Sequence, residues 1–158
     1  MRKNLGILLI SLIFVIFQES FMLEFFGSAL NPNLIVCVCF AFMLIDDYDG
    51  ALFTAFMGGL FYDLLGVGVV GLASFILILF LAASQWVKKT VLRGAWVQIL
   101  FIILATVFFK TALAYPDFVY NTGILVSGVI NVFISILFYG LLIKIKNRFL
   151  STEYRIKA

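Results

Sequence analysis

Residues 31–65 read NPNLIVCVCFAFMLIDDYDGALFTAFMGGLFYDLL, which is two apolar runs on either side of a short acidic segment. Asn31 can cap a helix, and Pro32 suits a first helical turn because its missing N–H has no partner there. The acidic segment at Asp46 and Asp47 ends the first run. The pattern predicts a helix over residues 32–45 and a second helix over residues 50–65.

The composition indicates that lipid is the solvent of this chain. Of its 158 residues, 65% are hydrophobic and 12% are charged, with a mean hydropathy of +1.20. Soluble domains are closer to half apolar and a quarter charged. A chain this apolar has too little polar surface to cover a globule in water, so a membrane protein without a soluble domain is expected.

The same apolar pattern continues along the chain and predicts an all-α membrane protein. Apolar runs are separated by short polar segments, and residues 1–158 are expected to form one domain of six transmembrane helices. The basic N-terminus leads into the first run without a small-residue cleavage motif, which favours a retained first span over a signal peptide. The expected helices cover residues 5–26, 32–45, 50–65, 69–87, 95–114 and 123–143, and residues 144–158 form a basic cytoplasmic tail.

The charges predict an orientation. Cytoplasmic segments of membrane proteins are enriched in Lys and Arg, and six crossings with an inside N-terminus place ten of the eleven basic residues inside. Lys110 alone falls near the outer face. Both termini are therefore expected in the cytoplasm. The inside residues are Arg2, Lys3, Lys88, Lys89, Arg93, Lys144, Lys146, Arg148, Arg155 and Lys157.

One alternative topology stays open. A run over residues 32–45 covers about 20 Å at 1.5 Å per residue, less than the roughly 30 Å hydrocarbon core. Runs 32–45 and 50–65 could therefore form a re-entrant pair that does not cross the membrane. Every charged segment would then stay on the same side of the membrane as in the six-crossing topology. Merging them into one crossing would move Lys88, Lys89 and Arg93 outside, so five crossings are disfavoured.

The run over residues 50–65 carries two rows of small residues, which let helix backbones approach closely in lipid. Gly58 and Gly59 close these rows, and Asp63 lies one turn beyond Gly59. A carboxylate at membrane depth is costly and faces protein or water. Asp63 either caps the Gly66–Gly71 turn or meets a partner. The rows are Gly50, Thr54, Gly58 and Ala51, Ala55, Gly59.

Other polar residues suggest structural roles. Gln18 and Glu19 are expected at a solvated outer helix end, with a pocket lining as the alternative. Lys110 is expected to reach the outer interface or to pair with Asp63 or Asp117. The acidic cluster Asp46, Asp47 and Asp49 predicts a solvated turn, since no calcium-loop glycine follows. Trp86 and Trp96 flank the Lys88–Arg93 loop and are expected as interface anchors.

The residues indicate no chemistry. The chain has no histidine, and Cys37 and Cys39 lie two apart inside an apolar run, a spacing that suggests neither a disulfide nor a metal site. No phosphate-binding loop, nucleophile–base pair or metal-ligand cluster is visible. We therefore expect no enzyme activity, no catalytic residue, no metal, no cofactor and no nucleic-acid partner.

Part of the chain resembles a known family. The segment Asn31–Ile35, the Gly50–Leu65 run with its Gly58-Gly59 pair and Asp63-Leu64-Leu65 element, and Gly71-Leu72-Ala73 resemble the rod shape-determining protein MreD. That family has a proline opening its second helix, a glycine-rich third helix and a Gly-Leu pair opening its fourth. The resemblance covers residues 31–74, and the rest of the chain agrees in hydropathy.

The resemblance implies a non-enzymatic scaffold of the cell-elongation machinery in a bacterial cytoplasmic membrane. It implies an MreC-like partner, possible association with the actin-like MreB and with peptidoglycan synthases, and support of cell shape. Its implied fold is similar to the substrate-binding subunits of energy-coupling-factor transporters, so a vitamin-type binding subunit is the alternative. Residues 5–17 lack the alanine row with which those subunits dock. The expected partner-binding or packing residues are Pro32, Gly58, Gly59, Asp63, Gly66 and Gly71.

The two functions differ in what they require of the fold. A scaffold needs an exposed apolar groove for another helix, whereas a binding subunit needs a closed pocket with convergent polar groups. The polar residues expected in the outer half could serve either purpose, and the sequence does not say whether they converge. They are Gln18, Glu19, Asp63, Lys110, Asn121 and Thr122.

Overall fold

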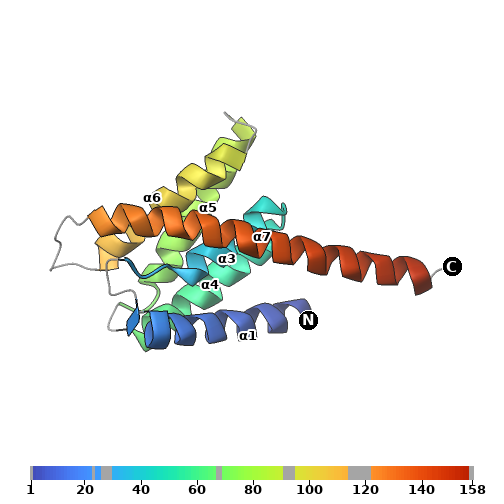
Figure 1. Cartoon of the computed structure of the whole chain (residues 1–158), viewed down its shortest axis with the longest axis horizontal. Coiled ribbons are helices and arrows are strands. Elements are labelled where there is room, and N and C mark those ends of the chain that lie inside the picture. Colours follow the sequence, from blue (N-terminus) through green and yellow to red (C-terminus); the bar gives the residue numbers. More distant parts are fainter. Residues whose placement is uncertain are drawn as a thin grey trace.

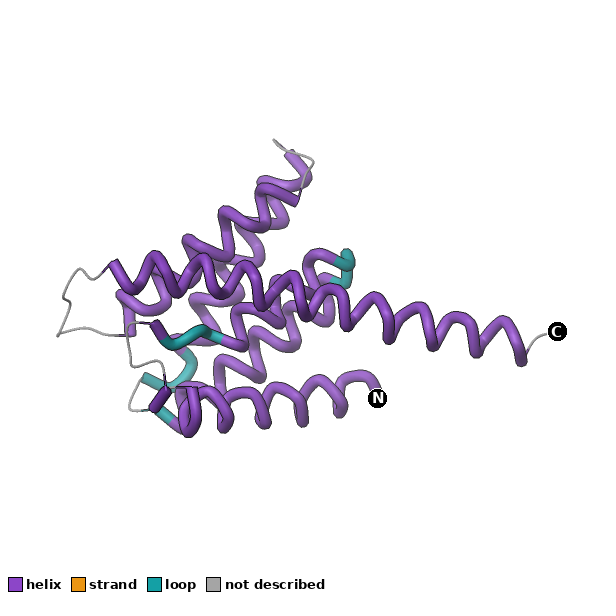
Figure 2. Tube along the Cα trace, in the orientation of Figure 1, coloured by secondary structure: helices purple, strands orange, loops and turns teal. Residues whose placement is uncertain are grey.

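The chain is all-helical across the residues that the computed structural model describes, which are 2–22, 24–25, 30–66, 69–90, 95–113 and 122–156. Six α-helices and one π-helical turn account for these residues, with short turns between them (Figures 1 and 2). They are α1 (Arg2–Phe17), η1 (Gln18–Met22), α3 (Leu34–Leu44), α4 (Tyr48–Leu65), α5 (Leu72–Thr90), α6 (Ala95–Leu113) and α7 (Thr122–Ile156).

The outer helices surround α3. Along the outside, α1 packs on α4, α4 on α5, α5 on α6, and α6 on α7, while α3 contacts every one of them. The helices α1 and α7 have few backbone contacts with each other, and the rings of Phe14 and Phe138 meet between them with centroids 5.2 Å apart. The ring around α3 is therefore loosest between the first and last helices; in Figure 1, α1 runs along the lower edge and α7 across the middle, with α3 and α4 seen between them.

The central helix α3 is the core. Its sequence is apolar on all sides, and the ten residues from Leu34 to Met43 are all buried. The outer helices bury one face each and leave large apolar side chains exposed, among them Leu79, Leu104 and Leu137. A helix hydrophobic all round is buried, whereas apolar side chains facing outward fit a lipid environment.

Among the described residues, three helices are long and apolar enough to cross a membrane, by length and composition, as in a multi-pass membrane protein. They cover Leu5–Met22, Leu72–Thr90 and Gly123–Ile145. Two further apolar helices, at Leu34–Leu44 and Trp96–Thr111, are shorter.

Asparagine and aspartate side chains cap the N-terminal ends of α3 and α4. Asn33 caps α3 by accepting from the Val36 N–H at 3.1 Å, and Asp47 caps α4 by accepting from the Gly50 N–H at 3.1 Å. The cap of α3 is thus Asn33 rather than Asn31. Pro32 lies before the cap, so its expected place in the first turn is wrong.

One expected helix boundary is also wrong, and the first helix changes type along its length. The prediction ends that helix at residue 26; α1 ends at Phe17, and a π-helical turn continues it to Met22, while residues 23 and 26–29 lie outside the described residues. The last helix was expected to end at residue 143, but α7 continues through the basic segment to Ile156. Its 35 residues extend about 52 Å at 1.5 Å per residue, and Figure 1 shows the C-terminal half projecting past the other helices.

Candidate functional site

The beginning of α3 is buried and is capped by other helices. The Asn33 N–H donates to Oδ1 of Asn131 on α7 at 2.9 Å, and the Leu34 N–H donates to Oε1 of Gln18 at 2.8 Å. The first N–H groups of a helix have no partner within the helix, and an unpaired one in an apolar interior is costly. Side chains from η1 and α7 remove that cost and hold α3 in position.

Asn131 is the centre of this polar cluster. Its Nδ2 donates to Oγ1 of Thr106 on α6 at 2.8 Å, and the Cys37 thiol lies 3.4 Å from its Oδ1. One turn earlier, the Ser127 hydroxyl donates to the Asn31 carbonyl at 3.1 Å. We call Gln18, Asn31, Asn33, Thr106, Ser127 and Asn131 the polar cluster. It joins η1, α3, α6 and α7 at one end of the bundle.

Asp63 ties α4 to the start of α5. It is 3% exposed, and its Oδ2 accepts from the Gly71 N–H at 2.8 Å and from the Ala73 N–H at 3.0 Å. Gly71 has a φ of +92°, which glycine adopts at little cost. Gly66 ends α4, its N–H bonded to the Tyr62 carbonyl. Residues 67–68 of this turn lie outside the described residues.

Gly58 and Gly59 lie where α4 touches its neighbours most closely. A Cβ on Gly59 would come within 2.5 Å of the Ser74 backbone nitrogen on α5, and one on Gly58 within 2.8 Å of the Ile35 side chain on α3. The Ser74 hydroxyl donates to the Phe56 carbonyl at 2.9 Å across the same contact. Small residues allow this approach, as they do between helices in lipid.

An apolar groove of about 180 Å³ lies in the gap between α1 and α7, with α3 as its floor. Along α1 its residues are spaced three and four apart, and along α7 they repeat that spacing. The only polar side chain in its lining is Ser11, whose hydroxyl is buried without a hydrogen-bond partner. The lining consists of Ile7, Ile10, Ser11 and Phe14 of α1, Val38 and Phe42 of α3, and Phe138, Leu141, Leu142 and Ile145 of α7.

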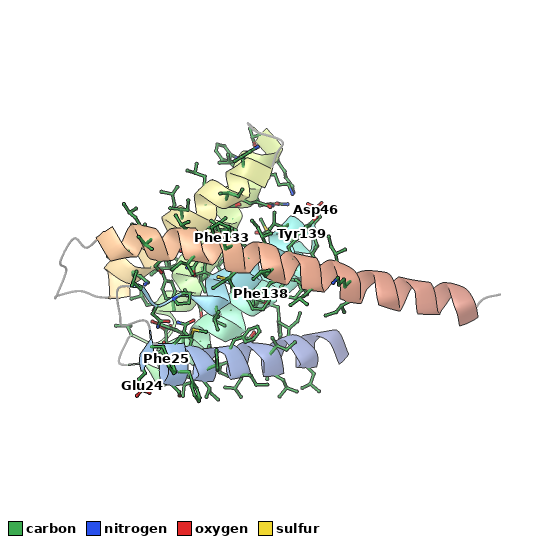
Figure 3. All side chains as sticks on the ribbon, in the orientation of Figure 1. Glu24, Phe25, Asp46, Phe133, Phe138 and Tyr139 are labelled. Carbon is green, nitrogen blue, oxygen red and sulfur yellow. The ribbon has the colours of Figure 1, made fainter. Side chains whose placement is uncertain are left out.

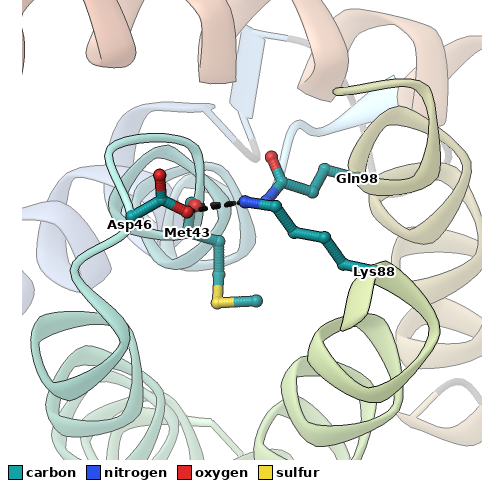
Figure 4. Close-up of polar contacts among 4 residues, drawn as sticks. All are labelled: Met43, Asp46, Lys88 and Gln98. Atoms are coloured by element: carbon teal, nitrogen blue, oxygen red, sulfur yellow. Dashed lines mark hydrogen bonds and ion pairs between the residues drawn. The ribbon is translucent and has the colours of Figure 1, made fainter. Parts of the chain in front are cut away.

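A second hollow, a cleft of about 800 Å³, lies on another side of α7 at the C-terminal end of α3. Lys88 of α5 reaches across to Asp46, with 2.6 Å between Nζ and Oδ1, and Nε2 of Gln98 donates to the Met43 carbonyl at 3.1 Å (Figure 4). In Figure 3, Tyr139 lies toward Asp46, whereas Phe138 lies toward α1. The groove and the cleft share no lining residue.

Among the described residues, none of the polar side chains expected in the outer half lines the groove or the cleft. Gln18 is 2% exposed and caps α3, so the expected solvated end is wrong for this residue. Glu19 accepts from the Gln18 amide at 3.4 Å. Lys110 lies in the last turn of α6. Asn121, Asp117 and the side chain of Thr122 lie outside the described residues.

Several functional candidates were missed by the sequence reasoning. Asn131, with Ser127 and Ser135 four residues before and after it, forms a polar row on one face of the last apolar run. That spacing is a signal that could have identified the polar cluster. Ser11 and Gln98 stand alone in apolar runs, and no pattern distinguishes them.

The chemistry of the described residues is that of helix capping and apolar contact. Within the described ranges, no three His, Cys, Asp or Glu side chains lie close enough to hold a metal ion. Comparisons with protein-family models, with curated proteins and with solved structures find no match for this chain.

Proposed function

We propose that the protein is an MreD-like scaffold that crosses a bacterial cytoplasmic membrane six times and holds the membrane-spanning helix of an MreC-like partner. The groove between α1 and α7 is the observation that carries this proposal. The other helices of the ring pack in sequence around α3, whereas α1 and α7 leave the groove between them, with the buried Val38 and Phe42 of α3 at its floor.

The shape and lining of the groove suit a helix. Ile7, Ile10, Ser11 and Phe14 lie at the i, i+3, i+4 and i+7 positions of α1, and the four α7 residues repeat this spacing. Two such rows, side by side, offer the ridges and hollows into which a third helix packs. The buried Ser11 hydroxyl supplies a hydrogen-bonding group, and polar side chains bond across helices in lipid.

A small polar ligand such as a vitamin fits the groove poorly, because specific ligand pockets place several polar groups around the ligand. The groove offers only the Ser11 hydroxyl. In the outer half, where a binding subunit of the transporter type would need such groups, Gln18 and Asp63 instead bond backbone N–H groups. This use of the polar side chains favours the scaffold over the transporter subunit.

A pair of tryptophan variants tests the groove. Ile10 lines it and is 48% exposed, whereas Ile13, on the same helix, is 60% exposed and lies outside it. Ile10→Trp fills the groove and is expected to reduce copurification of a co-expressed MreC-like partner at least ten-fold. Ile13→Trp, which adds the same side chain on a lipid-facing position, is expected to leave capture unchanged.

Cell shape and vitamin uptake separate the two functions in the same strains. With the scaffold, the Ile10→Trp host becomes round and keeps its vitamin uptake. Normal shape together with auxotrophy on depletion of the protein would reject the scaffold and favour the transporter subunit. Equal partner capture by both variants, at equal expression, would reject the groove as the docking site.

The proposed topology has its own test. Cysteines introduced at positions 3, 91 and 152 fall on the cytoplasmic side of a six-pass chain with both termini inside. A membrane-impermeant maleimide is expected to leave all three unlabelled in intact cells and to label them after permeabilisation. Labelling of position 91 in intact cells would contradict six crossings.

A further inference from the structure

The cleft at the C-terminal end of α3 is not used by the proposed scaffold function. It lies between α3, α5, α6 and α7, and its volume of about 800 Å³ is within the range of about 300–1,000 Å³ for small-molecule sites. Its lining is Leu44 and Asp46 after α3, Gln85, Lys88 and Lys89 of α5, Gln98, Ile99 and Ile102 of α6, and Val132, Ile136 and Tyr139 of α7.

The cleft is polar at one end and apolar at the other. Lys88 and Lys89 lie in the last turn of α5, and Tyr139 lies farther toward the C-terminal end of α7 than Val132 and Ile136. On α6, Ile102 lies one turn deeper than Gln98. Basic groups therefore mark the mouth, and branched aliphatic side chains line the interior.

Two tryptophans place the mouth at the level of lipid head groups. Trp86, in the last turns of α5, is 65% exposed, and Trp96, at the start of α6, is 82% exposed. Tryptophan is enriched where the hydrocarbon meets the head groups. The lysines of the cleft follow Trp86 within one helical turn, so a membrane that has Trp86 at its interface would have lipid phosphates near their ammonium groups.

We propose that this cleft binds one anionic phospholipid. Its phosphate lies at the mouth with Lys89 and Lys88, and an acyl chain lies against Ile99, Ile102, Val132 and Ile136. Basic pockets between membrane helices on the cytoplasmic side bind anionic head groups in this way. The site shares no residue with the groove, so it stands or falls independently of the scaffold proposal.

Charge identifies the head group. The cleft is lined by two lysines and one carboxylate. That carboxylate, Asp46, already forms an ion pair with Lys88. Lys89 is exposed, and no carboxylate of the described residues pairs with it. A phosphate beside Lys89 would balance the positive charge of this side chain. A zwitterionic head group would in addition bring its own positive charge toward the lysines.

The apolar interior favours a lipid over a soluble phosphate. A water-soluble anion would leave the aliphatic walls of α6 and α7 in contact with water, whereas an acyl chain would cover this apolar surface, which is favourable. The shared chemistry of the two ligands is the phosphate, so the experiment presents it with and without acyl chains.

Binding to the purified full-length protein in neutral detergent provides the test, with native mass spectrometry as the readout. The probes are phosphatidylglycerol, phosphatidylcholine with the same chains, and glycerophosphoglycerol, which has the head group alone. Wild-type protein is expected to bind phosphatidylglycerol at least ten-fold more tightly than either of the others. Lys89→Gln is expected to weaken that binding about five-fold, the effect of one lysine near an anionic head group.

Two further variants keep the result interpretable. Lys144→Gln removes one charge from an exposed position of α7 outside the cleft and is expected to leave binding unchanged. Ile136→Trp fills the apolar end without changing charge and is expected to reduce phosphatidylglycerol binding as much as Lys89→Gln. Equal binding of both phospholipids, or equal losses in Lys89→Gln and Lys144→Gln, would overturn the site. Tight binding of glycerophosphoglycerol would show that the cleft binds a soluble phosphate compound and would contradict the proposal of a lipid.

Discussion

The two ends of α3 are built in opposite ways. At its N-terminal end, Gln18 and Asn131 reach in from other elements and bond the Leu34 and Asn33 N–H groups, and all four residues are buried. At its C-terminal end, Asp46 is exposed, Lys88 reaches it across a cleft, and the neighbouring helices diverge. The closed end fixes the position of the helix, and the open end leaves room for a ligand. Substitutions should therefore cost more at the closed end.

The largest effect is expected from Gly59→Leu. The new Cβ would overlap the Ser74 backbone, which cannot move as a flexible side chain could, so α4 and α5 must separate. Overpacking of this kind costs about 1–3 kcal/mol or more, enough to lose most folded protein. The matched control is Gly140→Leu on α7, where nothing lies within 4 Å of the added Cβ.

Size-exclusion chromatography of both glycine variants in detergent measures this difference. Gly59→Leu is expected to give little monodisperse protein, and Gly140→Leu a wild-type yield. Equal yields would mean that the contact between α4 and α5 relaxes without cost.

Asn131→Ala is expected to have the next largest effect. It removes the acceptor of the Asn33 N–H and the donor to Thr106, both buried. An unpaired buried donor costs about 1–3 kcal/mol. Ser135→Ala, one turn further along α7, removes a hydroxyl that bonds the Asn131 carbonyl of its own helix and the Cys37 side chain, but leaves no backbone N–H of α3 unpaired. Thermal unfolding in detergent should show a clear loss for Asn131→Ala and a small one for Ser135→Ala, and equal losses would contradict the role of the polar cluster.

The smallest effect is expected at the open end, from Lys88→Gln. This variant breaks the ion pair with Asp46, whose side chain is 81% exposed. Exposed ion pairs contribute about 0–1 kcal/mol because water and salt screen them. The apparent melting temperature should therefore stay close to wild type, and a loss as large as that of Asn131→Ala would show that both ends of α3 are equally constrained.

The order and type of the helices could be predicted from the sequence, because runs of apolar residues separated by charges carry that information locally. The expected helix at 95–114 and the observed α6 at Ala95–Leu113 begin at the same residue, and residue 114 lies outside the described residues. The boundary of α7 could not be predicted this way, since a helix can continue through Lys144 into polar residues after its apolar part ends.

The sites were harder to predict because they depend on which helix faces which. Gln18 has the sequence context of a solvated helix end, and only the fold brings it to the Leu34 N–H. Asp63 was assigned two possible roles, and the structure gives it bonds to the Gly71 and Ala73 N–H groups. The groove joins residues more than 120 positions apart, such as Ser11 and Leu141, and no local pattern pairs them.

Photo-cross-linking in native membranes tests the central claim most directly. Leu141 and Leu137 lie one turn apart on α7 and are 55% and 69% exposed, but only Leu141 lines the groove. Each is replaced by a photoreactive phenylalanine analogue in cells that express an epitope-tagged MreC-like partner. The account predicts a cross-link to the membrane-spanning helix of that partner from position 141 and none from position 137. Cross-links of equal yield from both positions, or none from position 141 at normal expression, would contradict it.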